Sequence, residues 1–206
     1  MVAEGNQLSW KHEWATRMLA PLVDDIINVE PRVRDYYQKK YRKGVYFPII
    51  CDDTKARIRL KRILPISEKY VKQYQLEGKK VILFVGRLVS FKNILLAIRA
   101  YRSIANENTA FVIVGDGDLR ESVLEEAKEC KSIHYVGRKE GDELYAWYNV
   151  AQVFILPSVL EPFGAVTNEA LLGGCFALIS NRAGSQCLVE EGKNGFIINP
   201  ENQDSI

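Results

Sequence analysis

The sequence lacks any long hydrophobic run. None of its apolar stretches approaches the roughly 20 consecutive residues that a membrane-spanning helix requires. It also lacks the pattern of a secretory leader, in which a charged segment precedes an apolar one. We therefore expect a cytoplasmic protein, and we leave open that it binds peripherally at the inner face of the membrane.

Cysteine and histidine are scarce, at four and two residues in a chain of 206. His12 and His134 are far apart in the sequence. The cysteines form no Cys-x-x-Cys pair and lie in otherwise apolar or helical segments: Cys51, Cys130, Cys175 and Cys187. This pattern predicts reduced, packed thiols and argues against a bound metal. The chain also shows no protein nucleophile paired with a general base.

Charge is nearly balanced overall, at a formal +2, but it is unevenly distributed. Residues 32–72 contain 13 lysines and arginines against 4 aspartates and glutamates, a net charge of +9. One interpretation is a set of solvated helical faces. The other is attraction to an anionic partner, such as a membrane surface that carries a lipid-linked acceptor. The aromatic residues of this segment match no recognisable nucleic-acid-binding motif, so we expect no nucleic-acid partner.

From residue 79 onward, short runs of Val, Ile, Phe and Leu alternate with helical patterns. Runs of this kind, bounded by Gly, Asp, Asn or Ser, are typical of buried parallel strands. The pattern predicts an α/β fold with a doubly wound parallel sheet, whose ligands bind at the carboxyl ends of the strands. The expected strands are 81–85, 110–114, 133–136, 152–156, 176–180 and 195–198, and the expected helices are 92–106, 118–130, 141–149, 164–174 and 185–191.

Two glutamates, Glu161 and Glu169, stand eight positions apart around a Pro-Phe-Gly turn. In one continuous helix they would point about 80° apart. We therefore expect Glu161 in a loop and Glu169 in the first turns of a helix. The amides between them would be the unpaired donors of that helix and could bind an anion: Phe163, Gly164, Ala165 and Val166.

Two cations follow the first predicted strand of the sheet. Arg87 comes directly after Gly86, and Lys92 is expected to open the next helix. Together they could clamp a diphosphate, because arginine offers a planar fork and lysine a point charge. The alternative is two exposed cations near a helix start, where the helix dipole slightly disfavours them.

These motifs resemble those of the retaining GT-B glycosyltransferases, also called glycosyltransferase group 1 or family 4. The segment 161–169 resembles the Glu-seven-residues-Glu signature of that family. The resemblance covers roughly residues 78–200. Four further segments are similar to the other motifs of the family, in the same order: 81–92, 111–117, 152–158 and 184–195.

The resemblance implies a Rossmann-like, donor-binding domain and a role for each matched residue. Arg87, Lys92 and Glu161 would be catalytic, with the two cations replacing a metal ion at the leaving diphosphate. Glu169 would bind the ribose hydroxyls, and Arg138 would lie near the base or ribose. The amides of 163–166 would hold the sugar and the distal phosphate. The implied donor is a UDP- or GDP-sugar, transferred with retention of configuration and without a metal or cofactor.

The resemblance also divides the chain. Residues 1–75 would be the end of a first GT-B domain plus the interdomain linker, and residues 76–206 the nucleotide-sugar-binding domain. On this interpretation most of the N-terminal domain is missing, and the chain alone would be an inactive part of a hexosyltransferase-like enzyme of polysaccharide or glycolipid assembly. We also expect the apolar surface of 1–75 to promote self-association.

Other functions remain open at this point. A non-catalytic module that binds a nucleotide sugar would keep Arg87 and Glu169 yet transfer nothing. A related epimerase should show carboxylates and a histidine facing the anomeric carbon, and a phosphorylase should carry a cofactor lysine motif; neither pattern is visible. Three aromatic residues of segment 141–149 have the spacing of core residues, which favours packing over base stacking: Tyr145, Trp147 and Tyr148.

Overall fold

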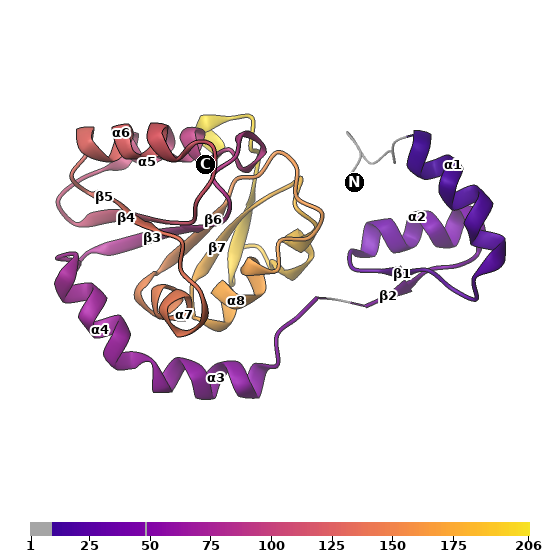
Figure 1. Ribbon diagram of the computed structural model, residues 1–206, viewed down its shortest axis with the longest axis horizontal. Coiled ribbons are helices and arrows are strands. Elements are labelled where there is room, and N and C mark those ends of the chain that lie inside the picture. The colour runs from indigo at the N-terminus through magenta and orange to yellow at the C-terminus, as the bar shows by residue number, and fades with distance from the viewer. Residues whose placement is uncertain (1–9, 48) are drawn as a thin grey trace.

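The computed structural model describes residues 10–47 and 49–206, and for residues 10–12 only the backbone. Pro48 and the side chain of His12 therefore lie outside the described part. The chain forms a six-stranded sheet domain and a smaller N-terminal part with two strands (Figure 1). Within the described residues, no helix is both long enough and apolar enough to cross a bilayer.

The sheet domain has the order β5-β4-β3-β6-β7-β8, and every neighbouring pair is parallel. This is the order of a Rossmann-like fold, with two halves that wind outward from β3 and β6. The predicted strands are confirmed, with bounds that shift by at most one residue. They are β3 (Lys80–Val85), β4 (Thr109–Val114), β5 (Ile133–Gly137), β6 (Val153–Leu156), β7 (Phe176–Ser180) and β8 (Gly195–Ile198).

Helices cover both faces of this sheet (Figure 1). On one face α5 (Ile94–Ile104) and α6 (Arg120–Glu129) pack against a cluster that contains Phe84 and Phe111. On the other, α7 (Gly141–Val150) and α8 (Val166–Leu172) pack against one that contains Leu83 and Trp147. Leu83 and Phe84 point to opposite faces because side chains alternate along a strand. The runs of consecutive apolar residues thus reflect burial on both sides.

The expected helices 118–130 and 164–174 are shortened to Arg120–Glu129 and Val166–Leu172. Two others differ in kind. Segment 92–106 is interrupted: a 3-10 turn (Ser90–Lys92) ends at Asn93, which has a left-handed φ of 58°, and α5 begins only at Ile94. Lys92 therefore precedes the helix instead of opening it. Segment 185–191 forms only a short 3-10 helix, η4 (Gly184–Leu188). Its first two amides bond to the carbonyls of Glu161 and Phe163, which ties this turn to the preceding loop.

The N-terminal part contains α1 (Trp10–Leu19), a 3-10 turn (Ala20–Leu22), β1 (Ile27–Asn28), α2 (Pro31–Tyr41) and β2 (Val45–Tyr46). The two strands pair in parallel and have two residues each. Glu30 caps α2 and is buried to 5% exposure, whereas the apolar side chains of Leu22, Ile27 and Phe47 are 78%, 72% and 67% exposed.

Two helices connect this part to the sheet domain. α3 (Asp53–Arg62) and α4 (Leu64–Gln73) run along the lower side of the domain in Figure 1. Both contact α7, and Tyr70 of α4 stacks on Trp147 with ring centroids 4.6 Å apart. Packing therefore joins α3 and α4 to the sheet domain. The division of the chain between residues 75 and 76 stays a prediction.

Candidate functional site at the carboxyl ends of the strands

The loops that follow β3 and β4 approach each other closely at the carboxyl edge of the sheet. A side-chain carbon added to Gly115 would lie 1.8 Å from the carbonyl oxygen of Gly86. Tyr135 donates a hydrogen bond of 3.1 Å to the carbonyl of Gly115 from the neighbouring strand. Only glycine fits at Gly115, so this residue fixes the backbone from which Arg87 projects.

Glu161 and Lys92 meet although 69 positions separate them. Glu161 lies in the loop after β6, as expected, and its backbone is held by a bridge to Ala183. Its carboxylate forms an ion pair with the ammonium group of Lys92, and the two side chains are only 11% and 13% exposed. The pair is thus largely shielded from water, where the attraction between charges is stronger than on an open surface.

Arg87 precedes Lys92 by five positions in the sequence, and it is exposed. Its guanidinium carbon is 5.5 Å from the centroid of the Phe91 ring, a cation–π distance. Among the described residues, no carboxylate lies within ion-pair distance of it. The guanidinium fork of Arg87 is thus available to an anion.

The backbone between the two glutamates has the form that its sequence predicts. Gly164 has a φ of +89°, and a carbon added there would lie 2.7 Å from Leu156 and 3.2 Å from Glu161 Cγ. α8 begins at Val166 and places Glu169 in its first turn. In the described part of the chain, no backbone or side-chain acceptor takes a hydrogen bond from the amides of residues 163–166.

Glu169 is held by two tyrosines of α7. The hydroxyl of Tyr148 donates to its Oε2 at 2.9 Å, and that of Tyr145 to its Oε1 at 3.3 Å. Trp147 and Tyr148 are fully buried, which confirms the predicted packing role for them. The contact of both hydroxyls with Glu169 was not predicted. Its only signal in the sequence is the three-residue spacing of Tyr145 and Tyr148, which puts them on one helix face.

Arg138, also predicted for the site, lies apart from these residues. It follows the edge strand β5 and forms an ion pair with Glu140, with both side chains more than 70% exposed. No hydrogen bond or ion pair connects it to Glu161, Lys92 or Glu169 within the described chain. The structure therefore brings together Lys92 and Glu161 directly and leaves Arg138 in solvent.

The N-terminal part reaches the same loops. A carbon added to Gly184 would lie 2.3 Å from the Pro162 carbonyl oxygen and 3.1 Å from Glu30 Cγ. Nearby, the Tyr46 hydroxyl is 3.9 Å from Cys187 Sγ. Sequence reasoning did not select Glu30, because nothing local to α2 indicates that its cap would face the loop after Glu161.

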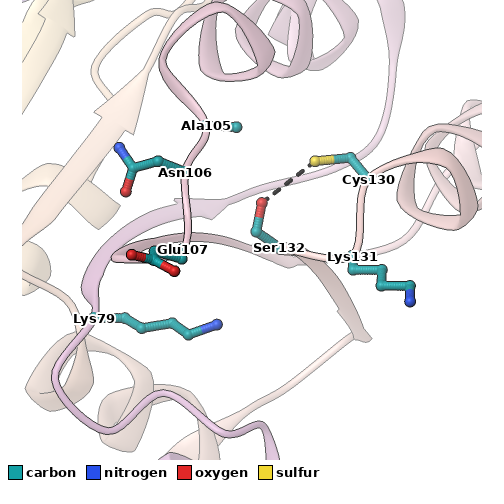
Figure 2. Close-up of a pocket in the computed structure, with 7 residues that line it drawn as sticks. All are labelled: Lys79, Ala105, Asn106, Glu107, Cys130, Lys131 and Ser132. Atoms are coloured by element: carbon teal, nitrogen blue, oxygen red, sulfur yellow. Dashed lines mark hydrogen bonds between the residues drawn. The ribbon is translucent and has the colours of Figure 1, made fainter.

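Two cavities occur at the opposite edge of the sheet, near the amino ends of the strands. The first, about 340 Å³, is lined by residues that include Lys79, Asn106 and Ser132 (Figure 2). The second, about 630 Å³, is lined by residues that include Gln152 and Asn194. Neither contains a predicted site residue. Across the described residues, no three His, Cys, Asp or Glu side chains are grouped as metal ligands.

Known proteins with similar sequences include glycosyltransferases. An uncharacterized glycosyltransferase of Methanocaldococcus jannaschii is 37% identical over 134 residues, which are 63% of this chain and 34% of that protein. A lipopolysaccharide 1,2-N-acetylglucosaminetransferase of Salmonella typhimurium is 31% identical over 144 residues, 63% of this chain and 38% of that protein. The chain thus spans little more than a third of these curated relatives.

Two solved structures illustrate the fold that this chain shares with known proteins. HepE of Anabaena, in complex with UDP, matches 99% of this chain and 58% of its own, with a TM-score of 0.81 and 16% identity. The α,α-trehalose 6-phosphate synthase of Burkholderia multivorans matches 94% of this chain and 52% of its own, with a TM-score of 0.77 and 17% identity. At these identities the likeness shows the fold alone.

The family described as "Glycosyl transferases group 1" matches residues 66–206, which include the whole six-stranded sheet and both signature glutamates. This match covers more than half of the chain and agrees with the relatives in sequence and in fold. The chain belongs to the group 1 glycosyltransferases.

Proposed function

We propose that this chain is the donor-binding part of a retaining glycosyltransferase, and that its sheet domain binds a nucleotide-diphosphate sugar. The observation that carries the proposal is the shielded pair of Lys92 and Glu161 beside the unbonded amides of residues 163–166. A cation, a carboxylate and free backbone donors in one place suit a ligand that combines phosphates with sugar hydroxyls.

The cations would act on the diphosphate. Arg87 offers a free guanidinium fork and Lys92 a point charge, and the amides of 163–166 add neutral donors. As the bond between the anomeric carbon and the phosphate oxygen breaks, negative charge grows on the departing nucleoside diphosphate. Fixed donors aimed at that charge lower the barrier, and no metal ion is needed for this role.

The carboxylates would act on hydroxyl groups. Glu169 would accept hydrogen bonds from the two ribose hydroxyls, and Glu161 would bind hydroxyls of the donor sugar and position its anomeric carbon. The incoming hydroxyl would attack the face that the diphosphate leaves and give its proton to that diphosphate. This sequence retains the configuration and needs no protein nucleophile.

The donor class is supported by the relatives. HepE was crystallised with UDP and with UDP and glucose, and the Salmonella relative transfers N-acetylglucosamine onto lipopolysaccharide. We propose a UDP- or GDP-sugar as donor and polysaccharide or glycolipid assembly as the process. The acceptor would bind to an N-terminal domain of a longer protein, so this chain alone would bind the donor without transferring it. A lipid-linked acceptor would place the enzyme peripherally at the inner face of the membrane.

Calorimetric titration of the 206-residue chain tests the proposal. UDP, GDP and ADP are titrated with their common sugar conjugates into the wild type and into Arg87→Ala, Glu169→Gln and Arg99→Ala. Arg99 is an exposed arginine of α5 and serves as the matched control. We expect UDP or GDP to bind, the first two variants to bind about 30-fold more weakly or worse, and Arg99→Ala to match the wild type.

Equal loss of binding in Arg87→Ala and Arg99→Ala, with binding by Glu169→Gln unimpaired, would indicate non-specific charge attraction and overturn the site. If neither UDP nor GDP binds to the wild type, the proposal that this chain contains a complete donor site is wrong. The same titration on the longer protein would then show whether any donor site exists.

A further inference from the structure

Two tyrosine hydroxyls converge on one carboxylate at the proposed ribose end of the donor site. Tyr148 donates to Oε2 of Glu169 at 2.9 Å and Tyr145 donates to Oε1 at 3.3 Å. Both residues belong to α7, their rings meet edge to face at 86°, and Glu169 belongs to α8. One helix thus engages both oxygens of a side chain on the next.

The two hydroxyls leave part of the carboxylate free. A carboxylate offers about four lone-pair positions, two on each oxygen. The two phenols occupy one position on each oxygen, so one remains on each. Two free positions, one per oxygen, match the two neighbouring hydroxyls of a ribose ring. The arrangement also fixes the plane of the carboxylate before any ligand arrives.

Both phenols are protonated donors at neutral pH. Burial raises the pKa of Tyr148 well above its usual value, and the charge of Glu169 raises it further. Burial and the same carboxylate also raise the pKa of Tyr145. Because neither hydroxyl ionises, neither can repel Glu169. The tyrosines therefore act on this carboxylate only as hydrogen-bond donors.

The tyrosines are themselves fixed. Tyr148 is fully buried and meets Phe154 of β6 edge to face. The guanidinium carbon of Arg59, on α3, is 4.1 Å from the centroid of the Tyr145 ring, and Arg59 is held in turn by Asp142 at 2.7 Å. A rigid support of this kind gives Glu169 a single orientation.

We infer that Tyr148 and Tyr145 are positioning residues for the donor nucleotide: they orient Glu169 so that both its oxygens face the ribose diol. The inference rests on the proposed function, because it assigns the ribose to Glu169. It goes further in naming two residues that touch no substrate yet determine how well a nucleotide with both ribose hydroxyls binds.

The test removes single hydroxyls from the protein and from the ligand. UDP, GDP and their 2′,3′-dideoxy analogues are titrated into the wild type, Tyr148→Phe and Tyr145→Phe. Tyr101→Phe is the matched control, because Tyr101 is also buried and its hydroxyl donates at 2.7 Å, but to Ser132 near the amino ends of the strands. Thermal unfolding of each variant, followed by circular dichroism, confirms that it is folded.

We expect Tyr148→Phe to weaken binding of the normal nucleotide about tenfold, and Tyr145→Phe, whose bond is longer, about threefold. Binding of the dideoxy analogue should change less than about twofold in either variant, since it has no diol for Glu169 to receive. Tyr101→Phe should bind both ligands as the wild type does.

Three results would overturn the inference. Equal weakening for the normal and dideoxy nucleotides would assign the tyrosines a structural role only. Unchanged binding in Tyr148→Phe, with Glu169→Gln still impaired, would mean that Glu169 needs no positioning while leaving the proposed function intact. No binding of UDP or GDP by the wild type would remove the donor site and this inference together.

Discussion

The sheet domain and the N-terminal part differ in where they keep their apolar residues. In the sheet domain Leu83, Phe84 and Trp147 have no exposed surface, and helices cover both faces of the sheet. In the N-terminal part Leu22 and Ile27 are more than 70% exposed, and each strand has only two residues. The first region holds its own core, whereas the second presents apolar surface. Stability should therefore depend on the first region and association on the second.

The largest effect on stability is expected from a substitution at Gly115 in the sheet domain. A carbon at this position would lie 1.8 Å from the carbonyl oxygen of Gly86, closer than any real contact. We expect Gly115→Ala to lower the free energy of unfolding by about 4 kcal/mol or more, because two backbone segments of the sheet domain must separate. Urea unfolding followed by far-UV circular dichroism measures this loss.

Gly44 is the counterpart of Gly115 in the N-terminal part. It has a φ of +150°, close to the +149° of Gly115, but a carbon added there meets its nearest atom at 3.0 Å. We expect Gly44→Ala to leave the main unfolding transition within about 1 kcal/mol of the wild type. Equal losses of unfolding free energy in Gly115→Ala and Gly44→Ala would contradict the expectation that stability depends mainly on the sheet domain.

Side-chain truncation should show the same contrast with a smaller effect. Leu83→Ala removes a fully buried side chain from β3 and should cost about 2 to 5 kcal/mol. Ile27→Ala shortens a side chain that is 72% exposed and should change stability by less than about 0.5 kcal/mol. The difference between the two midpoints of urea unfolding is the quantity to compare, and a difference near zero would reject the contrast.

The two regions also differed in how well the sequence predicted them. All six strands of the sheet domain were placed within one residue, because strands covered on both faces appear as unbroken apolar runs. In the N-terminal part, β1 has only two residues, Ile27–Asn28. Its pairing partner lies beyond a helix, and its apolar residues face solvent, so the local pattern carried little information.

In the site, the sequence predicted which residues share the carboxyl edge but not how they pair. Glu161 and Lys92 were both predicted as site residues. Their ion pair could not be predicted, because it depends on the conformation of the Glu161 loop, and Glu161 is 69 positions from Lys92 in the sequence. The hydrogen bonds from the tyrosines of α7 to Glu169 depend on how α7 and α8 are rotated relative to each other. No local sequence pattern determines that rotation. The prediction of a helix at 185–191 was wrong for a similar reason. The first amides of this segment donate hydrogen bonds to the carbonyls of Glu161 and Phe163 in the distant loop.

The exposed apolar residues of the N-terminal part should drive association of the chain. We expect the wild type to sediment with a coefficient that rises with concentration, because apolar surface is removed from water on contact. Replacing Leu22, Ile27 and Phe47 together by serine should abolish most of this dependence without changing the unfolding transition. Sedimentation velocity measures it, and an unchanged dependence in the triple variant would place the association elsewhere.

The smallest effect is expected at the contact between the connecting helix α3 and α7 of the sheet domain. The hydrogen bond from Arg59, aided by the charge of Arg62, lowers the pKa of Asp142. A carboxyl whose pKa is depressed in the folded state adds stability above its unfolded pKa of about 3.9 and loses it as pH falls through the folded value. Asp142→Asn should therefore be less stable than the wild type at neutral pH.

The two proteins should converge in acid, because the wild-type carboxyl is then protonated and resembles the amide. Thermal unfolding midpoints measured between pH 7 and pH 2.5 would show the gap closing below about pH 4. Asp204→Asn is the control, since Asp204 lies in the last 3-10 turn and forms no ion pair within the described residues. A gap that stays constant with pH would mean that Asp142 supports the α3–α7 contact through its shape and hydrogen bonds, with no contribution from its charge.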